Sequence, residues 1–174
     1  NPSTWIGLKL LLVTAQRRGE LANAAWEDIS FEERNWHIPQ LNSKNKRSHD
    51  VPLSLAAITL LEQQKTLAKD SPFAFPSKND PEKPMKPNSF TRALIRRNNS
   101  LGLEQFSVHD LRRTARTGFA KLKVSSDIAE MIINHSRGAM VDIYDRYTYE
   151  DEKREALEKW GSYLESLVLL NDMN

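Results

Sequence analysis

Arginine, lysine, histidine and tyrosine residues occur in this chain at spacings that together could bind and attack a phosphate. In the segment 107–114, His109 and Arg112 lie three residues apart. On a helix such residues share a face, so the two side chains would point the same way. Arginine offers a planar fork of donors and histidine a donor that titrates near neutral pH, which suits a phosphate. A capping histidine beside a surface arginine would look the same, so this pair alone leaves both interpretations open.

Two further segments carry cations that could reach the same anion. Arg17 stands at a break between helical patterns and is followed by Glu20, whose carboxylate could hold the guanidinium and aim it into a cleft. Lys44 begins a polar, basic turn between two predicted strands, where a flexible ammonium could pass a proton to a leaving oxygen. Exposed arginines and solvated hairpin tips are common, so neither segment is specific alone.

A histidine and a tyrosine complete the candidate set. His135 is followed nine residues later by Tyr144. A tyrosine hydroxyl has a pKa of about 10 and is a poor nucleophile at neutral pH unless cations and hydrogen bonds surround it. Arginine and histidine would supply both. A half-buried packing aromatic is the commoner role of a single tyrosine, and this alternative stays open.

Composition indicates one globular domain that must position these residues. The chain has 174 residues, 39% of them hydrophobic and 28% charged, with a net charge of +2 and no cysteine. The absence of cysteine excludes disulfides and thiolate chemistry. Basic residues dominate from 92 to 123 and acidic residues after 142, which predicts a basic face that could meet phosphates, or simply solvated helices. No apolar run approaches the ~18 residues of a membrane span.

The pattern of elements predicts a mainly α (α+β) fold with one small antiparallel sheet. Apolar spacing indicates helices at 5–13, 19–25, 55–65, 108–122, 126–134 and from about 150 onward. Asn88 is expected to cap a further helix that runs to about residue 98, and Ser54 to cap the one before it. Between them, residues 71–87 hold five of the eight prolines and are predicted to form a surface loop. Short segments between Trp26 and Leu53 are expected to form the sheet.

The joint order of these motifs resembles the tyrosine recombinase (phage integrase) family, over residues 8 to about 164. The resemblance extends to Tyr144-Asp145-Arg146 and to 152–154, which are similar to integrases of prophages and genomic islands. It implies the catalytic-domain fold of that family and six catalytic residues, namely Arg17, Lys44, His109, Arg112, His135 and Tyr144. Two positions depart from the pattern, since many members carry glycine where this chain has Ala15 and Asn134.

The resemblance also implies a mechanism. Tyr144 would attack the scissile phosphate, form a 3′-phosphotyrosine and release a 5′-hydroxyl. Arg17 and Arg112 would bind the non-bridging oxygens, Lys44 would protonate the leaving oxygen, and the two histidines would hydrogen-bond the phosphate. No cofactor, metal or ATP is expected, because the cations supply the charge stabilisation that Mg²⁺ supplies elsewhere and no glycine-rich phosphate loop is present.

The partners implied by the resemblance are double-stranded DNA attachment sites and three further copies of the protein. A homotetramer on DNA is expected, with the isolated domain a monomer, in the bacterial cytoplasm at the nucleoid and with no membrane contact. The chain is expected to be a single C-terminal catalytic domain (1–174), without the arm-binding and core-binding domains. The apolar stripe Leu157, Trp160, Leu164, Leu167 and Val168, with Leu169 and Leu170, could contact a neighbouring subunit or pack within its own domain.

Three functions other than recombination could use some of these residues. A type IB topoisomerase shares this chemistry, but the short hairpin and the Tyr144-Asp145-Arg146 context favour the integrase. A DNA-binding regulator that no longer cuts would be expected to lack a member of the catalytic set, and all six are present. A metalloprotein could use the four histidines, but their spacings fit no ligand pattern; they are His37, His49, His109 and His135.

Overall fold

The computed structural model describes residues 1–102, 104–135 and 148–172. Its helices are α1 (Pro2–Thr14), α2 (Arg18–Ala22), α3 (Leu55–Ala68), α4 (Asn88–Leu101), α5 (Val108–Lys121), α6 (Ser126–Ile132) and α8 (Glu150–Asp172). A short 3₁₀ helix η1 (Trp26–Asp28) precedes the strands β1 (Ile29–Ser30), β2 (Asn35–Ile38) and β3 (His49–Pro52). The predicted fold class, mainly helical with one small antiparallel sheet, is confirmed.

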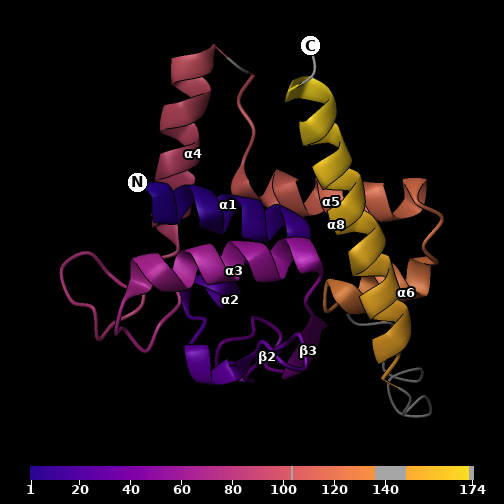
Figure 1. The fold of residues 1–174 in the computed structure, drawn as a ribbon, viewed down its shortest axis with the longest axis horizontal. Coiled ribbons are helices and arrows are strands. Elements are labelled where there is room, and N and C mark those ends of the chain that lie inside the picture. Colours follow the sequence, from indigo (N-terminus) through magenta and orange to yellow (C-terminus); the bar gives the residue numbers. More distant parts are fainter. Residues whose placement is uncertain (103, 136–147, 173–174) are drawn as a thin grey trace.

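Helix α1 lies at the centre of the fold. It packs against α3, α4, α5 and α8, and Figure 1 shows it alongside α3 with the sheet beneath them. The spacing of Ile6, Leu10 and Val13 predicted one buried face, but Leu8 and Leu11 are buried as well. A helix that is apolar on all sides is a core helix. The first predicted arginine therefore follows directly from the most buried helix of the domain.

The sheet has the order β1-β2-β3, and both neighbouring pairs are antiparallel. Ile38 pairs with His49, so residues 39–48 form the connection that carries Lys44. Trp26 and Phe31 lie outside the strands, contrary to the prediction, because Trp26 begins η1 and Phe31 lies in the turn before β2. Their rings stack on each other with centroids 6.2 Å apart.

Helix starts follow the local capping chemistry with one exception. The hydroxyl of Ser54 accepts a hydrogen bond from the backbone amide of Ala57, as predicted for the start of α3. The N-cap of α4 is Pro87, so Asn88 is the first helical residue and the cap predicted at this position is wrong. Proline has no backbone N–H to donate to a preceding helical turn, so it disfavours helix before it. Helix α4 therefore starts directly after Pro87.

Helix α8 closes the core through an aromatic contact with α5. Trp160 is 2% exposed, its indole nitrogen donates to the Leu12 carbonyl at 2.9 Å, and its ring lies against Phe119 at 6.0 Å between centroids. Leu157 is equally buried, whereas Val168 is 60% exposed. Leu157 and Trp160 of the predicted apolar stripe thus pack within their own domain, whereas Leu167 and Val168 are exposed.

The close approach of α8 to α5 predicts that Gly118→Ala lowers the free energy of unfolding by about 1–3 kcal/mol, because of overpacking. A Cβ at this position would lie 2.2 Å from the Trp160 ring. Urea denaturation of both proteins measures the difference. Gly19→Ala is the control, since its Cβ would meet nothing within 4 Å. Equal stability of the Gly118→Ala protein and the wild type would contradict this packing.

Candidate active site

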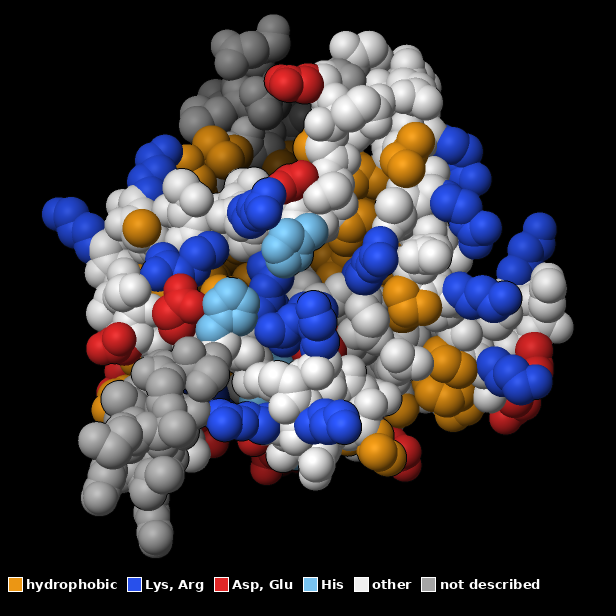
Figure 2. Space-filling model, turned by 180° about the vertical axis from the view of Figure 1, so that it is seen from behind, with side chains coloured by type: hydrophobic (Ala, Val, Ile, Leu, Met, Phe, Trp, Pro, Cys, Tyr) orange, Lys and Arg blue, Asp and Glu red, His pale blue; other side chains and the backbone are white. Residues whose placement is uncertain are grey.

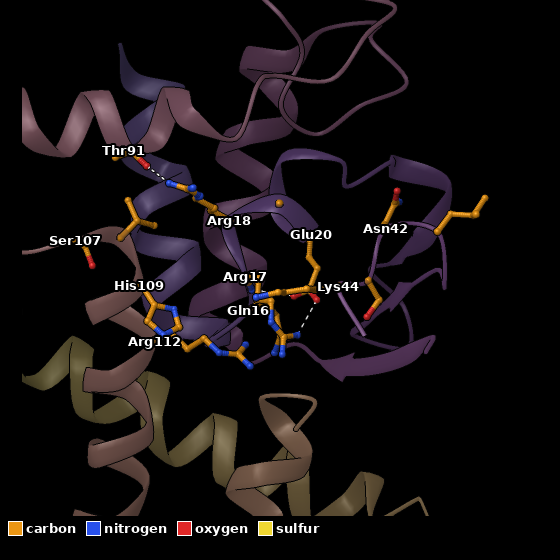
Figure 3. A pocket seen from close by; sticks show the side chains of 14 residues that line it. Gln16, Arg17, Arg18, Glu20, Asn42, Lys44, Thr91, Ser107, His109 and Arg112 are labelled. Carbon is orange, nitrogen blue, oxygen red and sulfur yellow. Dashed lines mark hydrogen bonds and ion pairs between the residues drawn. The ribbon is translucent and has the colours of Figure 1, made fainter. Parts of the chain in front are cut away.

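A hollow of about 620 Å³ lies where the α1–α2 junction, the start of α5 and the β2–β3 connection meet. Figure 3 shows side chains from these three parts of the chain around it. Four of the six predicted catalytic residues line it, namely Arg17, Lys44, His109 and Arg112. The structure thus brings together cations that are up to 95 residues apart in the sequence, from Arg17 to Arg112.

Arg112 forms the floor of this hollow and is 4% exposed. Its guanidinium donates to the Ala15 carbonyl at 2.6 Å and to the Ile133 carbonyl. These residues are the C-caps of α1 and α6, where unsatisfied carbonyls carry partial negative charge that favours a cation. Burial, and then the positive charge of Arg17, lower the pKa of Arg112 to about 10, so it stays charged at neutral pH.

Arg17 lies opposite Arg112, with both guanidinium groups directed at the same space (Figure 3). It is the N-cap of α2, and Glu20 accepts from its backbone amide at 2.9 Å and from its guanidinium at 3.0 Å. Glu20 is only 1% exposed. The carboxylate predicted to hold the first arginine therefore does so, and the guanidinium keeps further donors for an anion.

Lys44 and His109 are the exposed members of the set. Lys44 lies in the β2–β3 connection, where its ammonium borders the hollow. His109 is in the first turn of α5, whose start is fixed by a capping box between Ser107 and Asp110. Partial burial and the cations Arg113 and Arg112 lower the pKa of His109, which favours the neutral imidazole at pH 7.

His135 lies across from these residues, on a second hollow of about 410 Å³ that Arg17 also lines. Its Nδ1 is 2.8 Å from the Glu130 carboxylate, and Glu130 also accepts from Arg116 at 2.7 Å. A proton on Nδ1 donated to this carboxylate leaves Nε2 for another partner. Tyr144, the predicted nucleophile, lies outside the described residues.

Three polar residues that were not predicted as part of the site connect its parts. Gln16 is buried and donates to the Ile132 carbonyl at 2.8 Å, while its side-chain oxygen is 3.1 Å from His49 Nε2. The other ring nitrogen of His49 is 2.8 Å from the Asn134 amide nitrogen. The sequence offered one signal, the glycine-to-asparagine departure at Asn134, but nothing that pairs residues 85 positions apart.

The backbone shows why glycine suits both positions at which this chain carries another residue. Ala15 has φ 58° and Asn134 has φ 48°, in the left-handed region that costs a non-glycine residue about 1–2 kcal/mol. Ala15 is completely buried, and its carbonyl is one of the two that bind Arg112. Asparagine tolerates this conformation better than most residues, because its side chain hydrogen-bonds locally.

Lys and Arg side chains gather around histidines in the middle of the face in Figure 2, and further ones follow its edge. Two arginines and a lysine that converge on one open hollow, with the His109 imidazole beside them, favour a phosphate-like anion. Among the described residues, no group of three or more His, Asp or Glu side chains could hold a metal ion, and no helix could span a membrane. The histidine metal site is therefore not formed there.

Comparisons with known proteins identify the same family as the motifs. The profile described as "Phage integrase family" matches residues 3–151. The prophage integrase IntA of Escherichia coli K12 is 32% identical over 157 residues, which cover 89% of this chain and 37% of IntA. The integrase of Shigella phage Sf6 is 32% identical over 165 residues, or 94% of this chain and 42% of that protein. The chain therefore spans about two fifths of the length of these relatives.

Known structures share the fold. The integrase from mycobacterium phage Brujita superposes with a TM-score of 0.74 at 17% identity, covering 92% of this chain and 52% of that one. The lambda integrase catalytic core has a TM-score of 0.63 at 22% identity and covers 83% of this chain and 82% of that one. A lambda integrase tetramer bound to a Holliday junction has a TM-score of 0.62 at 21% identity, covering 84% and 43%.

Arg112→Lys is expected to lower the free energy of unfolding by about 2 kcal/mol, because one ammonium cannot satisfy two carbonyls that a planar fork bridges. The matched control is Arg113→Lys, whose native side chain is 73% exposed; its effect should stay within about 0.5 kcal/mol. Urea denaturation measures both variants. If Arg112→Lys and Arg113→Lys lower the free energy of unfolding equally, the hydrogen bonds from Arg112 to the Ala15 and Ile133 carbonyls do not stabilise the fold.

His49 should make stability depend on pH. Burial, followed by the charges of Lys153, Arg17 and Arg112, lowers its pKa to about 4 from 6.5. The unfolded chain then binds a proton that the folded chain does not, so stability is full above pH 6.5 and falls toward pH 4, by on the order of 2 kcal/mol. His49→Gln should flatten this slope in thermal melts at pH 4 to 7. An unchanged slope would contradict a neutral, half-buried His49.

Proposed function

Because this chain belongs to the phage integrase family of tyrosine recombinases, we propose that it is the catalytic domain of a site-specific DNA recombinase. It cleaves and rejoins DNA through a 3′-phosphotyrosine intermediate. The observation that carries this proposal is the convergence of Arg17, Arg112, His109 and Lys44 on one open hollow. This set of donors matches a phosphodiester whose charge grows during the reaction.

The two arginines bind the non-bridging oxygens of the scissile phosphate. Arg112 is fixed by the two carbonyls and Arg17 by the Glu20 carboxylate, so neither guanidinium needs to reorganise when the substrate arrives. Preorganised donors of this kind each contribute about 2.7–4 kcal/mol to transition-state stabilisation. His109 and His135 add hydrogen bonds to the same phosphate from two sides.

Tyr144 acts on the bond to phosphorus that forms, and Lys44 acts on the bond that breaks. The Tyr144 oxygen passes its proton to a base and forms the bond to phosphorus, while the bond to the 5′-oxygen breaks. Lys44, at the rim of the hollow, gives its proton to that leaving oxygen. Attack of the 5′-hydroxyl of a second duplex on the phosphotyrosine reverses these steps and rejoins the strand. This chemistry requires neither a metal nor ATP.

Exchange between two duplexes requires several protomers, and we propose a homotetramer on double-stranded DNA attachment sites. The outward-facing end of α8, which includes Leu167 and Val168, is the proposed contact with a neighbouring protomer. Because the chain spans about two fifths of its relatives, we also propose that it is the C-terminal catalytic domain of a longer protein. The place of action is the bacterial cytoplasm, on the nucleoid.

The experiment that tests this function is a covalent trapping assay. The full protein that contains this chain is incubated, with EDTA, with a labelled duplex that spans its attachment site. We expect wild-type protein to form an adduct that survives a denaturing gel, and Tyr144→Phe to form none, since it lacks the attacking oxygen.

Two outcomes would change the proposal. If wild-type protein binds the duplex without forming an adduct, the chain is a DNA-binding regulator on a recombinase fold. If the Tyr144→Phe protein still forms the adduct, another tyrosine is the nucleophile, and Tyr147→Phe and Tyr149→Phe are the next variants to assay.

A further inference from the structure

We infer that Asn134 and Asn45 form an amide clip that positions Lys44 for proton donation to the leaving 5′-oxygen. The inference rests on the proposed function and adds two positioning residues to it. Asn45 immediately follows Lys44 in the β2–β3 connection, and Asn134 follows α6 and precedes His135. The clip therefore joins the turn that carries the general acid to the other wall of the site.

The two side chains bond to each other twice. The Asn45 amide nitrogen donates to the Asn134 side-chain oxygen at 2.9 Å, and the Asn134 amide nitrogen donates back to the Asn45 oxygen at 3.2 Å. Asn45 also donates to the Asn134 backbone carbonyl at 3.1 Å, and that carbonyl lies 3.4 Å from the Arg17 guanidinium. The turn, the first arginine and the residue before His135 thus meet at one carbonyl.

Neighbouring bonds fix the orientation of both amides. The Asn45 oxygen accepts from the Ser43 hydroxyl at 2.7 Å and from the Arg47 backbone amide, so the turn is organised around Asn45. On the other side, Asn134 Nδ2 lies 2.8 Å from His49 Nδ1. A lowered pKa keeps His49 neutral, so Nδ1 accepts from Asn134 while Nε2 donates to Gln16. In both hydrogen bonds of His49, a donor then faces an acceptor.

Asn45 and Ser43 connect this exposed turn with Asn134. Residues 44–48 are exposed, and Lys46 has a left-handed backbone with φ 56°. Ser43, at 6% exposed, is the buried end of this segment, and its hydroxyl lies 3.3 Å from Asn134 Nδ2, where it shares one amide hydrogen with the Asn45 oxygen. The hydrogen bonds of Asn134 therefore restrict where the Lys44 ammonium can lie relative to the two arginines. A misplacement of about 1 Å can lower a rate about a hundredfold.

The test is cleavage by the full protein with Asn134→Gly on two attachment-site duplexes. Glycine accepts the φ of 48° and removes only the amide, so the fold is retained, which thermal melting checks. On a normal duplex we expect cleavage about ten- to a hundredfold slower than wild type. The second duplex has sulfur in place of the bridging 5′-oxygen. A thiol has a pKa of about 8.5 and leaves as thiolate without a general acid, so the variant should cleave it at close to the wild-type rate.

Further variants separate the clip from other effects. Asn45→Ala should be at least as slow as Asn134→Gly, because it also removes the bond to the Asn134 backbone carbonyl. The double variant should be no slower than Asn45→Ala, because the amide–amide contact is already absent. Gln40→Ala removes an exposed amide from the same connection and should cleave both duplexes like wild type. Arg17→Ala should be slow on both duplexes, because its role is charge stabilisation rather than proton transfer.

Two results would overturn the clip. Asn134→Gly that cleaves the normal duplex at the wild-type rate would show that Lys44 needs no such support. Equal slowing on the oxygen and sulfur duplexes would show that Asn134 positions His135 or the arginines instead of Lys44. If wild-type protein forms no adduct with either duplex, the proposed function itself fails, and the clip fails with it.

Discussion

The buried guanidinium of Arg112 is the interaction on which the rest of the structure depends. A charge that is 4% exposed is costly unless it is fully hydrogen-bonded, and here two helix C-terminal carbonyls satisfy it. Those carbonyls, of Ala15 and Ile133, end α1 and α6, so one side chain of α5 fixes three helices relative to one another. The left-handed backbone of Ala15 is the conformational cost of turning the first carbonyl toward it. These two hydrogen bonds also leave the Arg112 guanidinium facing the hollow.

The polar network on the other side of Arg112 extends this arrangement to the sheet. Gln16 and His49 connect the end of α1 with the first residue of β3, and Asn134 connects both with the β2–β3 connection. A hydrogen-bonded network of this kind favours one relative position of the elements it joins, because any polar group left without a partner away from water would cost its full desolvation energy. The apolar core around α1 and Trp160 stabilises the domain, whereas these polar contacts set the relative positions of the site residues. The apolar core therefore contributes mainly to stability, and the polar contacts contribute mainly to the geometry of the site.

How far the sequence predicted the structure has physical causes. Helical periodicity located α1, α3, α5 and α8, and the His-x-x-Arg spacing placed His109 and Arg112 on one helix, because both are local patterns. Trp26 was wrongly placed in the sheet, since an aromatic residue suits a strand and a packed turn equally well. The Asn134–Asn45 contact joins residues 89 positions apart, and no local pattern encodes such a pairing. The assignment of Tyr144 rests on its spacing from His135, because it lies outside the part of the chain that the structure describes.

The central claim is that Arg17 and Arg112 neutralise the charge of a scissile phosphate. Cleavage of a duplex with an uncharged methylphosphonate at the scissile position tests it most directly, because a methyl group replaces one charged oxygen. The variant is Arg17→Ala combined with Glu20→Gln, which avoids an unpaired buried carboxylate, and Glu20→Gln alone is the reference. We expect a large defect of the double variant on normal DNA and a much smaller one on methylphosphonate DNA. Equal defects on both duplexes would contradict it and would show that Arg17 does not act on the phosphate charge.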